Sequence, residues 1–487
     1  MAPRVRLKNV SSIGRKLKPG GVHRRLPGFL AVAALTAACT ALPPSAEPPA
    51  SPGTQVWASG YHTRYGSPRP SAIAVTPDGR AVFVTGAGPT TVSYDAATGM
   101  QRWARGYNGP AKSVNIPAAI AVSPDGRRVF VTGWDRVGDG ADYATIAYSA
   151  STGRQLWLSR YSPPAGGTAV ASAVVVSRDG KTVFVTGHSG GSYTTIAYNT
   201  ATGARRWLKR LGVATTDSKP RDMALSPDGK TIYVTGDGGG ALHHDYLTVA
   251  YNAATGATRW FTNYNGPANG NDDANALVVA PDGKTVYVTG GSAGRSSGSD
   301  YATVAYDAAT GAQRWVSRYN GPGNADDEGG SLAITPDGRT LLVNGLSKGP
   351  NHGPGRVLGD ATVAYNAATG AWLWTQRTLG YPGDYSSLPA LKAQTLAISP
   401  DGSTAYVTGI NAVTCCKSDY ATVAYAIDGG TTQWLSLYSG PGKYKGSGNN
   451  SNQAIALALS PGGSTLYVTG VTVRTKFGGF GTVAYRT

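Results

Sequence analysis

Short apolar runs separated by tight polar turns recur along almost the whole chain. Residues 276–322 show the pattern in full: ALVVAPDGKTVYVTGGSAGRSSGSDYATVAYDAATGAQRWVSRYNGP. This unit holds four runs rich in β-branched and aromatic residues, which predict four short β-strands. Because the unit recurs seven more times with altered loops, we predict a repeat protein built from one kind of four-stranded sheet.

Two turn motifs divide each repeat. A Pro-Asp-Gly triplet joins the first and second runs, since Pro presets φ and Gly accepts a positive φ. The triplet occurs, with small changes, at eight places that begin at residues 77, 124, 178, 227, 281, 336, 400 and 461. An Ala-Thr-Gly turn joins the third and fourth runs. The apolar residues of the runs do not alternate with charged ones, so both faces of each sheet must be covered.

A tryptophan follows the second turn in each complete repeat, four residues after its Gly. These residues are Trp103, Trp157, Trp207, Trp260, Trp315, Trp374 and Trp434. Trp57 precedes the first repeat and has no turn before it, whereas the last repeat stops at TVAYRT without a fourth run. We therefore predict an all-β fold, a single β-propeller of eight four-stranded blades over residues 54–487, with seven blades as the alternative. The N-terminal strand would pair into the last blade and close the ring.

The N-terminus is typical of an export signal. Residues 1–38 carry eight Lys and Arg and no acid, and the apolar run 29–42 is shorter than the roughly 20 residues that a spanning helix needs. We predict a signal peptide over residues 1–38 and a Pro/Ala/Ser-rich linker over residues 39–53. Cys39 stands where a lipoprotein cysteine would stand, so lipidation and ordinary secretion are both open. Either outcome places a bacterial protein outside the cytoplasm, secreted or lipid-anchored at the cell surface.

Charge and composition narrow the possible partners. The full chain carries +17; without the eight leader cations, 36 Lys and Arg face 27 Asp and Glu, which leaves +9. Much of this charge lies beside the repeated tryptophan, and no basic run is interleaved with aromatic residues in one place. We therefore expect no nucleic-acid binding, and membrane contact only through a lipid anchor. Glutamate occurs only at Glu47 and Glu328, so carboxylate chemistry would depend on Asp.

Chain topology indicates where the function lies. In blades whose strands run up and down, the two short turns share one face, here called the turn face. The long and varied loops share the opposite face, here called the loop face, and such loops usually carry function. The candidate ligand-binding residues on the loop face are Trp134, Asp135, His188, His243, His244, His352, Cys415 and Cys416.

The acidic residues of the loop face have structural interpretations. Asp precedes the third run at Asp142, Asp245, Asp300, Asp360 and Asp419, which predicts bonds from these carboxylates to backbone N–H groups. The clusters 272–273 and 326–328 are expected to be solvated loops, with calcium binding as the alternative. His243 and His244 could bind a metal together with His188, but solvated histidines are the expected state. No metal site is predicted.

The pattern AY(D/N)AATGxxxW resembles the tryptophan-docking repeat of quinoprotein-type propellers, a family that includes the pyrroloquinoline-quinone dehydrogenases. The segment SPDGKTxYVTG resembles the repeat of bacterial surface-layer and extracellular propellers. Together the two motifs extend over nearly all of residues 54–487. The resemblance implies that the repeated tryptophan packs between blades. It implies no single function, because the family includes enzymes, assembly scaffolds and sensors.

The two neighbouring cysteines of the predicted mature chain could pair with each other, pair between molecules or stay free in an oxidising compartment. Some alcohol dehydrogenases of the quinoprotein family carry an adjacent-cysteine disulfide beside their quinone, and this resemblance implies a disulfide between Cys415 and Cys416.

The function that we predict is an exported binding or scaffold propeller without a cofactor, with a protein or glycan partner on the loop face. The alternatives are a quinoprotein-like dehydrogenase, which would use pyrroloquinoline quinone with calcium, and a carbohydrate-acting propeller. No catalytic residue can be assigned: no C-x-x-C-H haem site occurs, and no Asp matches the dehydrogenase base.

Overall fold

The computed structural model describes residues 50–62, 69–88, 90–107, 109, 115–138, 140–163, 167–212, 218–239, 243–349, 358–378, 395–414, 417–440, 450–473 and 478–487. These residues lie within a compact unit that spans Ala50–Thr487. They form thirty-three strands and no helix. The described part of the chain therefore contains no helix able to cross a membrane.

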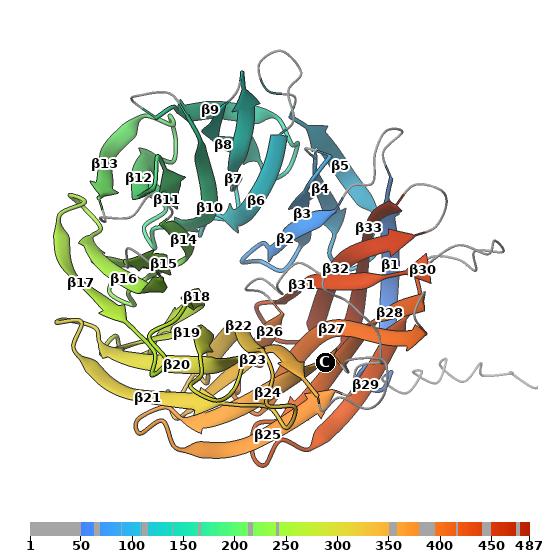
Figure 1. Ribbon diagram of the computed structural model, residues 1–487. Helices are drawn as coiled ribbons and strands as arrows, with labels where there is room; N and C mark the ends of the chain where they lie inside the picture. Colours follow the sequence, from blue (N-terminus) through green and yellow to red (C-terminus); the bar gives the residue numbers. More distant parts are fainter. Residues whose placement is uncertain are drawn as a thin grey trace, which may run out of the picture. The chain divides into compact units, whose positions relative to one another are not determined.

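The strands form eight antiparallel sheets arranged in a ring (Figure 1). Blade 1 consists of β2 (Pro70–Val75), β3 (Ala81–Gly86), β4 (Thr90–Asp95) and β5 (Gln101–Gly106), and blade 2 of β6 (Asn115–Val122), β7 (Arg128–Val137), β8 (Gly140–Ser149) and β9 (Gln155–Tyr161). Blade 3 consists of β10 (Ala169–Val176), β11 (Thr182–Ser189), β12 (Ser192–Asn199) and β13 (Arg205–Leu211), and blade 4 of β14 (Lys219–Leu225), β15 (Thr231–Gly239), β16 (His244–Asn252) and β17 (Thr258–Tyr264).

Blades 5 to 8 follow in the same order around the ring. Blade 5 consists of β18 (Asp272–Val279), β19 (Thr285–Ala293), β20 (Ser299–Asp307) and β21 (Gln313–Tyr319), and blade 6 of β22 (Asp327–Ile334), β23 (Thr340–Lys348), β24 (Leu358–Asn366) and β25 (Trp372–Thr378). Blade 7 consists of β26 (Leu396–Ile398), β27 (Thr404–Thr414), β28 (Lys417–Ala426) and β29 (Thr432–Tyr438), with β30 (Asn450–Ser451) parallel to β28. Blade 8 consists of β31 (Gln453–Leu459), β32 (Thr465–Val473), β33 (Gly478–Arg486) and β1 (Gln55–Tyr61). The prediction of eight blades is confirmed, and the seven-bladed alternative is wrong.

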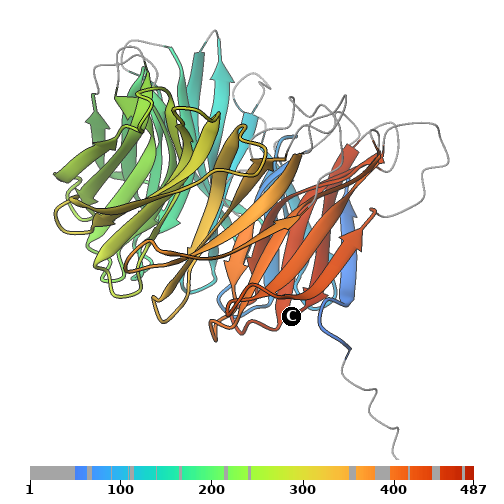
Figure 2. The ribbon, with the colours of Figure 1, turned by 60° about the horizontal axis from the view of Figure 1, so that its bottom comes forward.

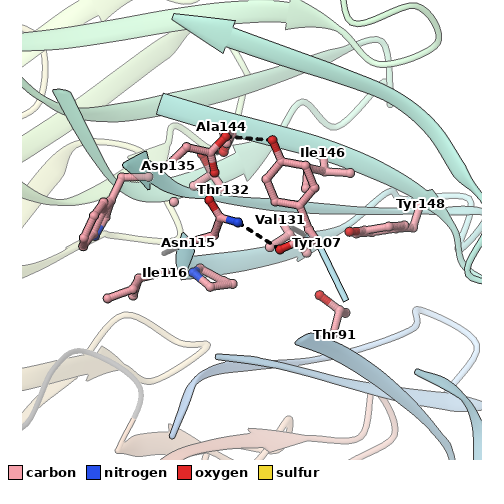
Figure 3. Close-up of a pocket in the computed structure, with 13 residues that line it drawn as sticks. Thr91, Tyr107, Asn115, Ile116, Val131, Thr132, Asp135, Ala144, Ile146 and Tyr148 are labelled. Carbon is pink, nitrogen blue, oxygen red and sulfur yellow. Dashed lines mark hydrogen bonds between the residues drawn. The ribbon is translucent and has the colours of Figure 1, made fainter. Parts of the chain in front are cut away.

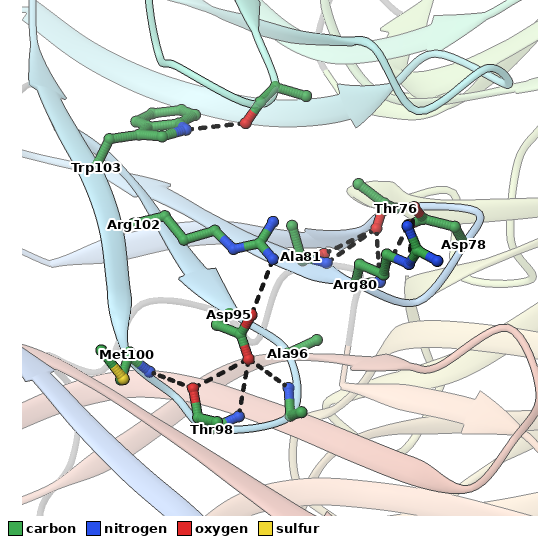
Figure 4. A network of polar contacts seen from close by, with 12 residues as sticks. Thr76, Asp78, Arg80, Ala81, Asp95, Ala96, Thr98, Met100, Arg102 and Trp103 are labelled. Carbon is green, nitrogen blue, oxygen red and sulfur yellow. Dashed lines mark hydrogen bonds and ion pairs between the residues drawn. The ribbon is translucent and has the colours of Figure 1, made fainter.

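The turns form because local side chains satisfy their backbone groups (Figure 4). In the first Pro-Asp-Gly turn, Asp78 Oδ1 accepts the Arg80 N–H at 3.0 Å. In the first Ala-Thr-Gly turn, Asp95 Oδ1 accepts the Thr98 N–H at 3.1 Å, and Asp95 Oδ2 accepts Arg102 Nη2 at 2.8 Å. The hydrogen bond from Thr76 and the Arg80 N–H lower the pKa of Asp78. These polar groups are therefore used within the turns themselves.

The hydrophobic core lies between neighbouring blades. The Trp103 ring packs over Gly153 of the next blade, where a Cβ would lie 2.6 Å from the indole, and its N–H donates to Ala150 O at 2.9 Å. One core cluster accordingly joins Phe83 and Trp103 of blade 1 to Ile146 of blade 2. The indoles of Trp57, Trp157, Trp207, Trp260, Trp315 and Trp374 make the same hydrogen bond.

A β-bulge in the innermost strand explains the recurring Thr-Gly at the end of the second run. In blade 5 the register of β18 with β19 shifts between Ala274 and Ala276. The bulge brings the Asp273 carbonyl so close to Gly290 that a Cβ there would lie 1.9 Å from the oxygen. Only glycine fits this close approach of the carbonyl oxygen. The extra residue of the bulge is unpaired, and its side chain takes a different direction from those of its neighbours.

The ring closes through β1, which pairs antiparallel with β33 from Trp57 opposite Ala484 to Tyr61 opposite Phe480. Figure 1 and Figure 2 show this N-terminal strand, in blue, beside the red strands of the last blade. The predicted closure by the N-terminal strand is confirmed.

The junction of the two chain ends imitates an Ala-Thr-Gly turn. Gly53 has a φ of +77°, and a Cβ on it would lie 2.9 Å from the Trp434 ring of blade 7. Its N–H donates to Arg486 O at 2.8 Å, as the Gly99 N–H donates to Asp95 O at 2.9 Å in the continuous turn of blade 1. Noncovalent contacts therefore replace the one turn that the chain does not make.

Candidate functional site

The structure places five of the predicted loop-face residues. Trp134 and Asp135 lie near the loop-face end of β7, His188 lies in β11, and His243 and His244 lie at the start of β16. His352, Cys415, Cys416, Cys39 and the leader 1–38 lie outside the described residues, so the predictions for them stay predictions.

A hollow between blades 1 and 2 contains Trp134 and Asp135 (Figure 3). Its free space is about 20 Å³ for the centres of water molecules, which is room for one or two waters. The lining is mostly apolar and consists of Thr91, Tyr107, Asn115, Ile116, Pro117, Val131, Thr132, Gly133, Trp134, Asp135, Ala144, Ile146 and Tyr148. Without movement of the walls, this space takes a small group and not a whole cofactor.

A hydrogen-bond network holds the polar side of the hollow. Tyr107 OH and Arg160 Nε donate to Asp135 Oδ2 at 2.7 and 3.0 Å, and Arg160 Nη2 also donates to Tyr107 OH. Asn115 Nδ2 donates to the Tyr107 carbonyl at 3.0 Å, and Figure 3 shows how Tyr107 joins both residues. Desolvation and the bond to Asp135 raise the pKa of Tyr107, so its hydroxyl remains a donor. The carboxylate of Asp135 is thereby paired through one oxygen only.

A second polar group lies on the two innermost strands of blade 4 and on the innermost strands of blades 5 and 6. We call Arg221, Asp237, Asp273, Asn275 and Glu328 the inner-strand cluster. Arg221 Nη2 is 2.6 Å from Asp237 Oδ2 and 3.8 Å from Asp273 Oδ1, and Asn275 Nδ2 donates to Glu328 Oε1 at 2.8 Å. The side chains of Arg221 and Asp273 are 30% and 39% exposed. The cluster therefore offers a partly exposed charged surface at the loop-face end of these strands.

The β-bulges place this cluster. The register shifts at Arg221 in β14 and at Asn275 in β18, so each is the bulged residue of its strand. In blade 3 the residue at the bulge is Ser172. Desolvation lowers the pKa of Arg221, but its hydrogen bonds to Asp237 and the charges of Asp273 and Glu328 outweigh this effect and raise it.

Asp222, next to Arg221, is a carboxylate at a position where most blades have alanine. It pairs with Thr235 in the sheet, as Ala276 pairs with Thr289. Its two oxygens accept the N–H groups of Met223 and of Leu277 at 2.8 and 2.9 Å, the latter from the next blade. Desolvation nevertheless raises the pKa of Asp222 to about 6 from the ordinary 3.8.

We expect Asp222 to lower the free energy of unfolding as the pH rises. Because the folded pKa lies above the unfolded one, the folded state binds the proton more tightly, and this advantage is lost as the pH rises from about 4 to about 6. The loss would be about 3 kcal/mol. Urea unfolding between pH 4 and pH 7 measures it, with Asp222→Ala as the comparison because alanine occupies this position in other blades. Parallel pH profiles for the two proteins would contradict the expectation.

The expectation of solvated acidic loops is wrong for Asp272 and Asp327, which are fully buried. Asp272 accepts the N–H groups of Gly266 and Ala293 at 2.6 and 3.1 Å. Asp327 accepts the Gly321 N–H at 2.6 Å and the Lys348 N–H at 3.1 Å. A buried carboxylate needs such donors. Through these hydrogen bonds, each carboxylate holds the loop that enters its blade in place.

The expectation that Asp binds backbone N–H groups before the third run is wrong for Asp142 and Asp300. Asp142 accepts the Ser162 hydroxyl at 2.7 Å, and Asp300 pairs with Arg318 at 3.0 Å. Asp360 is not their counterpart, since it occupies the register position that Tyr301 holds in blade 5. Desolvation raises the pKa of Asp360 to about 7.

Within the described ranges, no three His, Cys, Asp or Glu side chains come together as a metal site. His243 is exposed and His244 is half-buried. The backbone N–H of His244 donates to Asn271 Oδ1 at 3.2 Å.

The sequence pattern did not identify most of the residues at the hollow or in the inner-strand cluster. It did not single out Tyr107, Asn115 or Arg160 at the hollow, nor Arg221 and Asn275 in the inner-strand cluster. One signal was available for Arg221: the first run of the other repeats carries small or apolar residues, whereas PRDMAL carries two charges.

A sequence model of the PQQ-like repeat, described as outer membrane protein assembly factor BamB, matches residues 49–221 and 196–349, more than half of the chain. No curated protein matches the chain in sequence.

Several solved structures are similar to this chain at low sequence identity. Dihydro-heme d1 dehydrogenase NirN, solved in complex with DHE, is 16% identical with a TM-score of 0.51, over 79% of this chain and 69% of that chain. BamB from Moraxella catarrhalis is 16% identical with a TM-score of 0.49, over 89% and 99%. The hydrazine synthase of Kuenenia stuttgartiensis is 18% identical with a TM-score of 0.49, over 71% and 94%. The likeness to NirN, at 16% identity, shows the fold alone and says nothing of activity. On the match of the family model and the eight-bladed fold, the chain belongs to the PQQ-like β-propeller family of BamB.

Proposed function

We propose that this protein is an exported binding or scaffold propeller that holds a protein partner on its loop face. Membership of the BamB family supports the proposal, because the family description names an assembly factor. The family description also names the outer membrane, which is consistent with the basic, apolar leader. Location outside the cytoplasm, secreted or lipid-anchored through Cys39, is part of the proposal.

One observation carries the proposal: the two faces of the ring differ in how their polar groups are used. On the turn face, carboxylates such as Asp78 and Asp95 are bound to the backbone of their own turns. On the loop face, the inner-strand cluster joins charged side chains of blades 4, 5 and 6, and Arg221 and Asp273 are 30% and 39% exposed. A charged surface that extends over three neighbouring blades of a repetitive ring suits the recognition of one partner in one orientation.

The dehydrogenase and carbohydrate alternatives have no such observation in their favour within the residues that the structure describes. Pyrroloquinoline quinone with calcium would need a group of acidic ligands, and the described side chains do not form one. Pyrroloquinoline quinone with calcium therefore stays an alternative that the family resemblance implies.

Photo-crosslinking from the two faces tests the proposal. A benzophenone amino acid replaces Asp273 on the loop face or, as the matched control, exposed Lys284 on the turn face of the same blade. In living cells that export the protein, we expect a discrete adduct with one protein from position 273, about five-fold weaker from position 284. Equal labelling from both positions, or adducts with this chain alone, would contradict the proposal.

A further inference from the structure

Two acceptor atoms at the hollow between blades 1 and 2 have no hydrogen-bond partner among the described residues. They are Asn115 Oδ1 and Asp135 Oδ1, on residues that are 3% and 0% exposed. Asn115 and Asp135 lie opposite each other in β6 and β7, so their side chains are direct cross-strand neighbours. Both residues line the hollow, and a buried acceptor without a donor is costly.

Blade 5 shows how the same position is satisfied elsewhere. There the pair is Asp272 opposite Ser292, and both carboxylate oxygens of Asp272 accept backbone N–H groups. The equivalent arginine, Arg318, binds the Ser292 hydroxyl at 2.6 Å and Asp300 at 3.0 Å. Blade 6 has the same arrangement, with Asp327 opposite Ser347.

Blade 2 reverses the two residue types. The carboxylate is on β7, where it takes the arginine, and the amide on β6 donates to the Tyr107 carbonyl. The reversal leaves one buried oxygen of each residue without a donor among the described residues. It is the only one of these three blades in which both members of the pair keep an unused oxygen.

The charge and the two unused acceptors of the hollow define what fits there. Asp135 is already paired with Arg160 at 3.0 Å, so an ammonium group would add an uncompensated charge to a mostly apolar space. A hydroxyl carries one hydrogen, whereas two acceptors need two. Water and a primary amide nitrogen are both uncharged and each carry two hydrogens, and of the two only the amide can be supplied by a partner protein.

We propose that this hollow receives the side-chain carboxamide of an asparagine or glutamine from the bound partner. Its NH2 group donates one hydrogen bond to Asn115 Oδ1 and one to Asp135 Oδ1, and its methylene groups pack against Ile116 and Pro117. This inference rests on the proposed function, because the asparagine or glutamine belongs to the protein partner that is proposed to bind the loop face. The free space fits the amide head alone, and the methylenes lie toward its opening.

Acetamide is the probe that tests the hollow, with acetone as a probe of similar shape and no N–H donor. Saturation-transfer NMR on the chain 50–487 is expected to give a signal from the acetamide methyl group, about ten-fold above that from acetone. A crystal soaked in acetamide is expected to show it between Asn115 and Asp135. Equal signals from the two probes, or density for a water molecule only, would overturn the inference.

The double variant Asn115→Asp, Asp135→Ser is the matched control, because it rebuilds the pair found in blades 5 and 6. Arg160 can then bind Asp142, which lies opposite residue 135 as Asp300 lies opposite Ser292. The melting temperature should stay as in the parent, while the acetamide signal should fall about ten-fold. An undiminished signal in a folded variant would place the acetamide elsewhere and overturn the inference.

The crosslinking experiment separates this inference from the proposed function. Crosslinks from position 273 do not depend on the hollow. If they form while acetamide fails to bind, the inference is wrong and the proposed function stands. If acetamide binds and no partner is crosslinked, the chemistry of the hollow is supported and the proposed function is contradicted.

Discussion

Removal of residues 50–61 is expected to abolish cooperative thermal unfolding and to cause aggregation. The deletion removes β1 and leaves β33 as an open sheet edge, which is a template for intermolecular pairing. It also removes Trp57, an 8% exposed core residue whose ring lies 5.8 Å from that of Tyr467 and whose N–H donates to Ala96 O at 2.9 Å. Blade 8 therefore loses its outer strand and its contact with blade 1 together.

Calorimetry and light scattering of chain 62–487 beside chain 50–487 measure this effect. A synthetic peptide of residues 50–61 is expected to restore part of the lost stability, because the closure is noncovalent. If the truncated chain unfolded cooperatively within about 2 °C of the longer chain, the closing role of β1 would be refuted.

Gly256→Ala is expected to destabilise the propeller far more than a glycine substitution in the other turn of the same blade. At Gly256, φ is +74°, and a Cβ would lie 2.7 Å from the Trp207 ring. The variant combines left-handed backbone strain with displacement of a packed indole, and we expect a loss of about 3 kcal/mol or more.

Gly229→Ala is the matched control for this variant. Its φ is +72°, but nothing lies within 4 Å of the Cβ position. Only the backbone strain remains, so the expected cost is about 1 kcal/mol. Urea unfolding of the two variants compares them directly. Equal losses would show that backbone strain alone requires the glycine, and that the contact between Trp207 and Gly256 adds little.

The sequence by itself determined the architecture, since the signals for it are local and repeated. Each Pro-Asp-Gly and Ala-Thr-Gly turn is specified by a few adjacent residues, whose side chains bind their own backbone. The closure of the ring by the N-terminal strand could be predicted for the same reason. One fragment carries Trp57 without a turn, and the other ends at Thr487 without a fourth strand. The number of blades follows from counting.

The sequence also singled out Trp134 and Asp135, because they lie in a varied loop-face segment of a regular repeat. It did not show what they contact. The pairing of Asp135 with Arg160 and with Tyr107 joins β7 to β9 and to the end of blade 1. Similarly, Asp272 and Asp327 were expected in solvated loops, and their burial depends on loop N–H groups that no spacing rule predicts.

Only the tertiary structure decided which polar groups are satisfied and which are free. Asn115 opposite Asp135 and Asp272 opposite Ser292 are similar pairs in sequence, yet only the first pair leaves an unused oxygen on both residues. The inner-strand cluster likewise brings together Arg221 and Glu328 from blades 4 and 6. The physical reason is that turns depend on neighbours along the chain, whereas these contacts depend on bulges and on how separate blades pack.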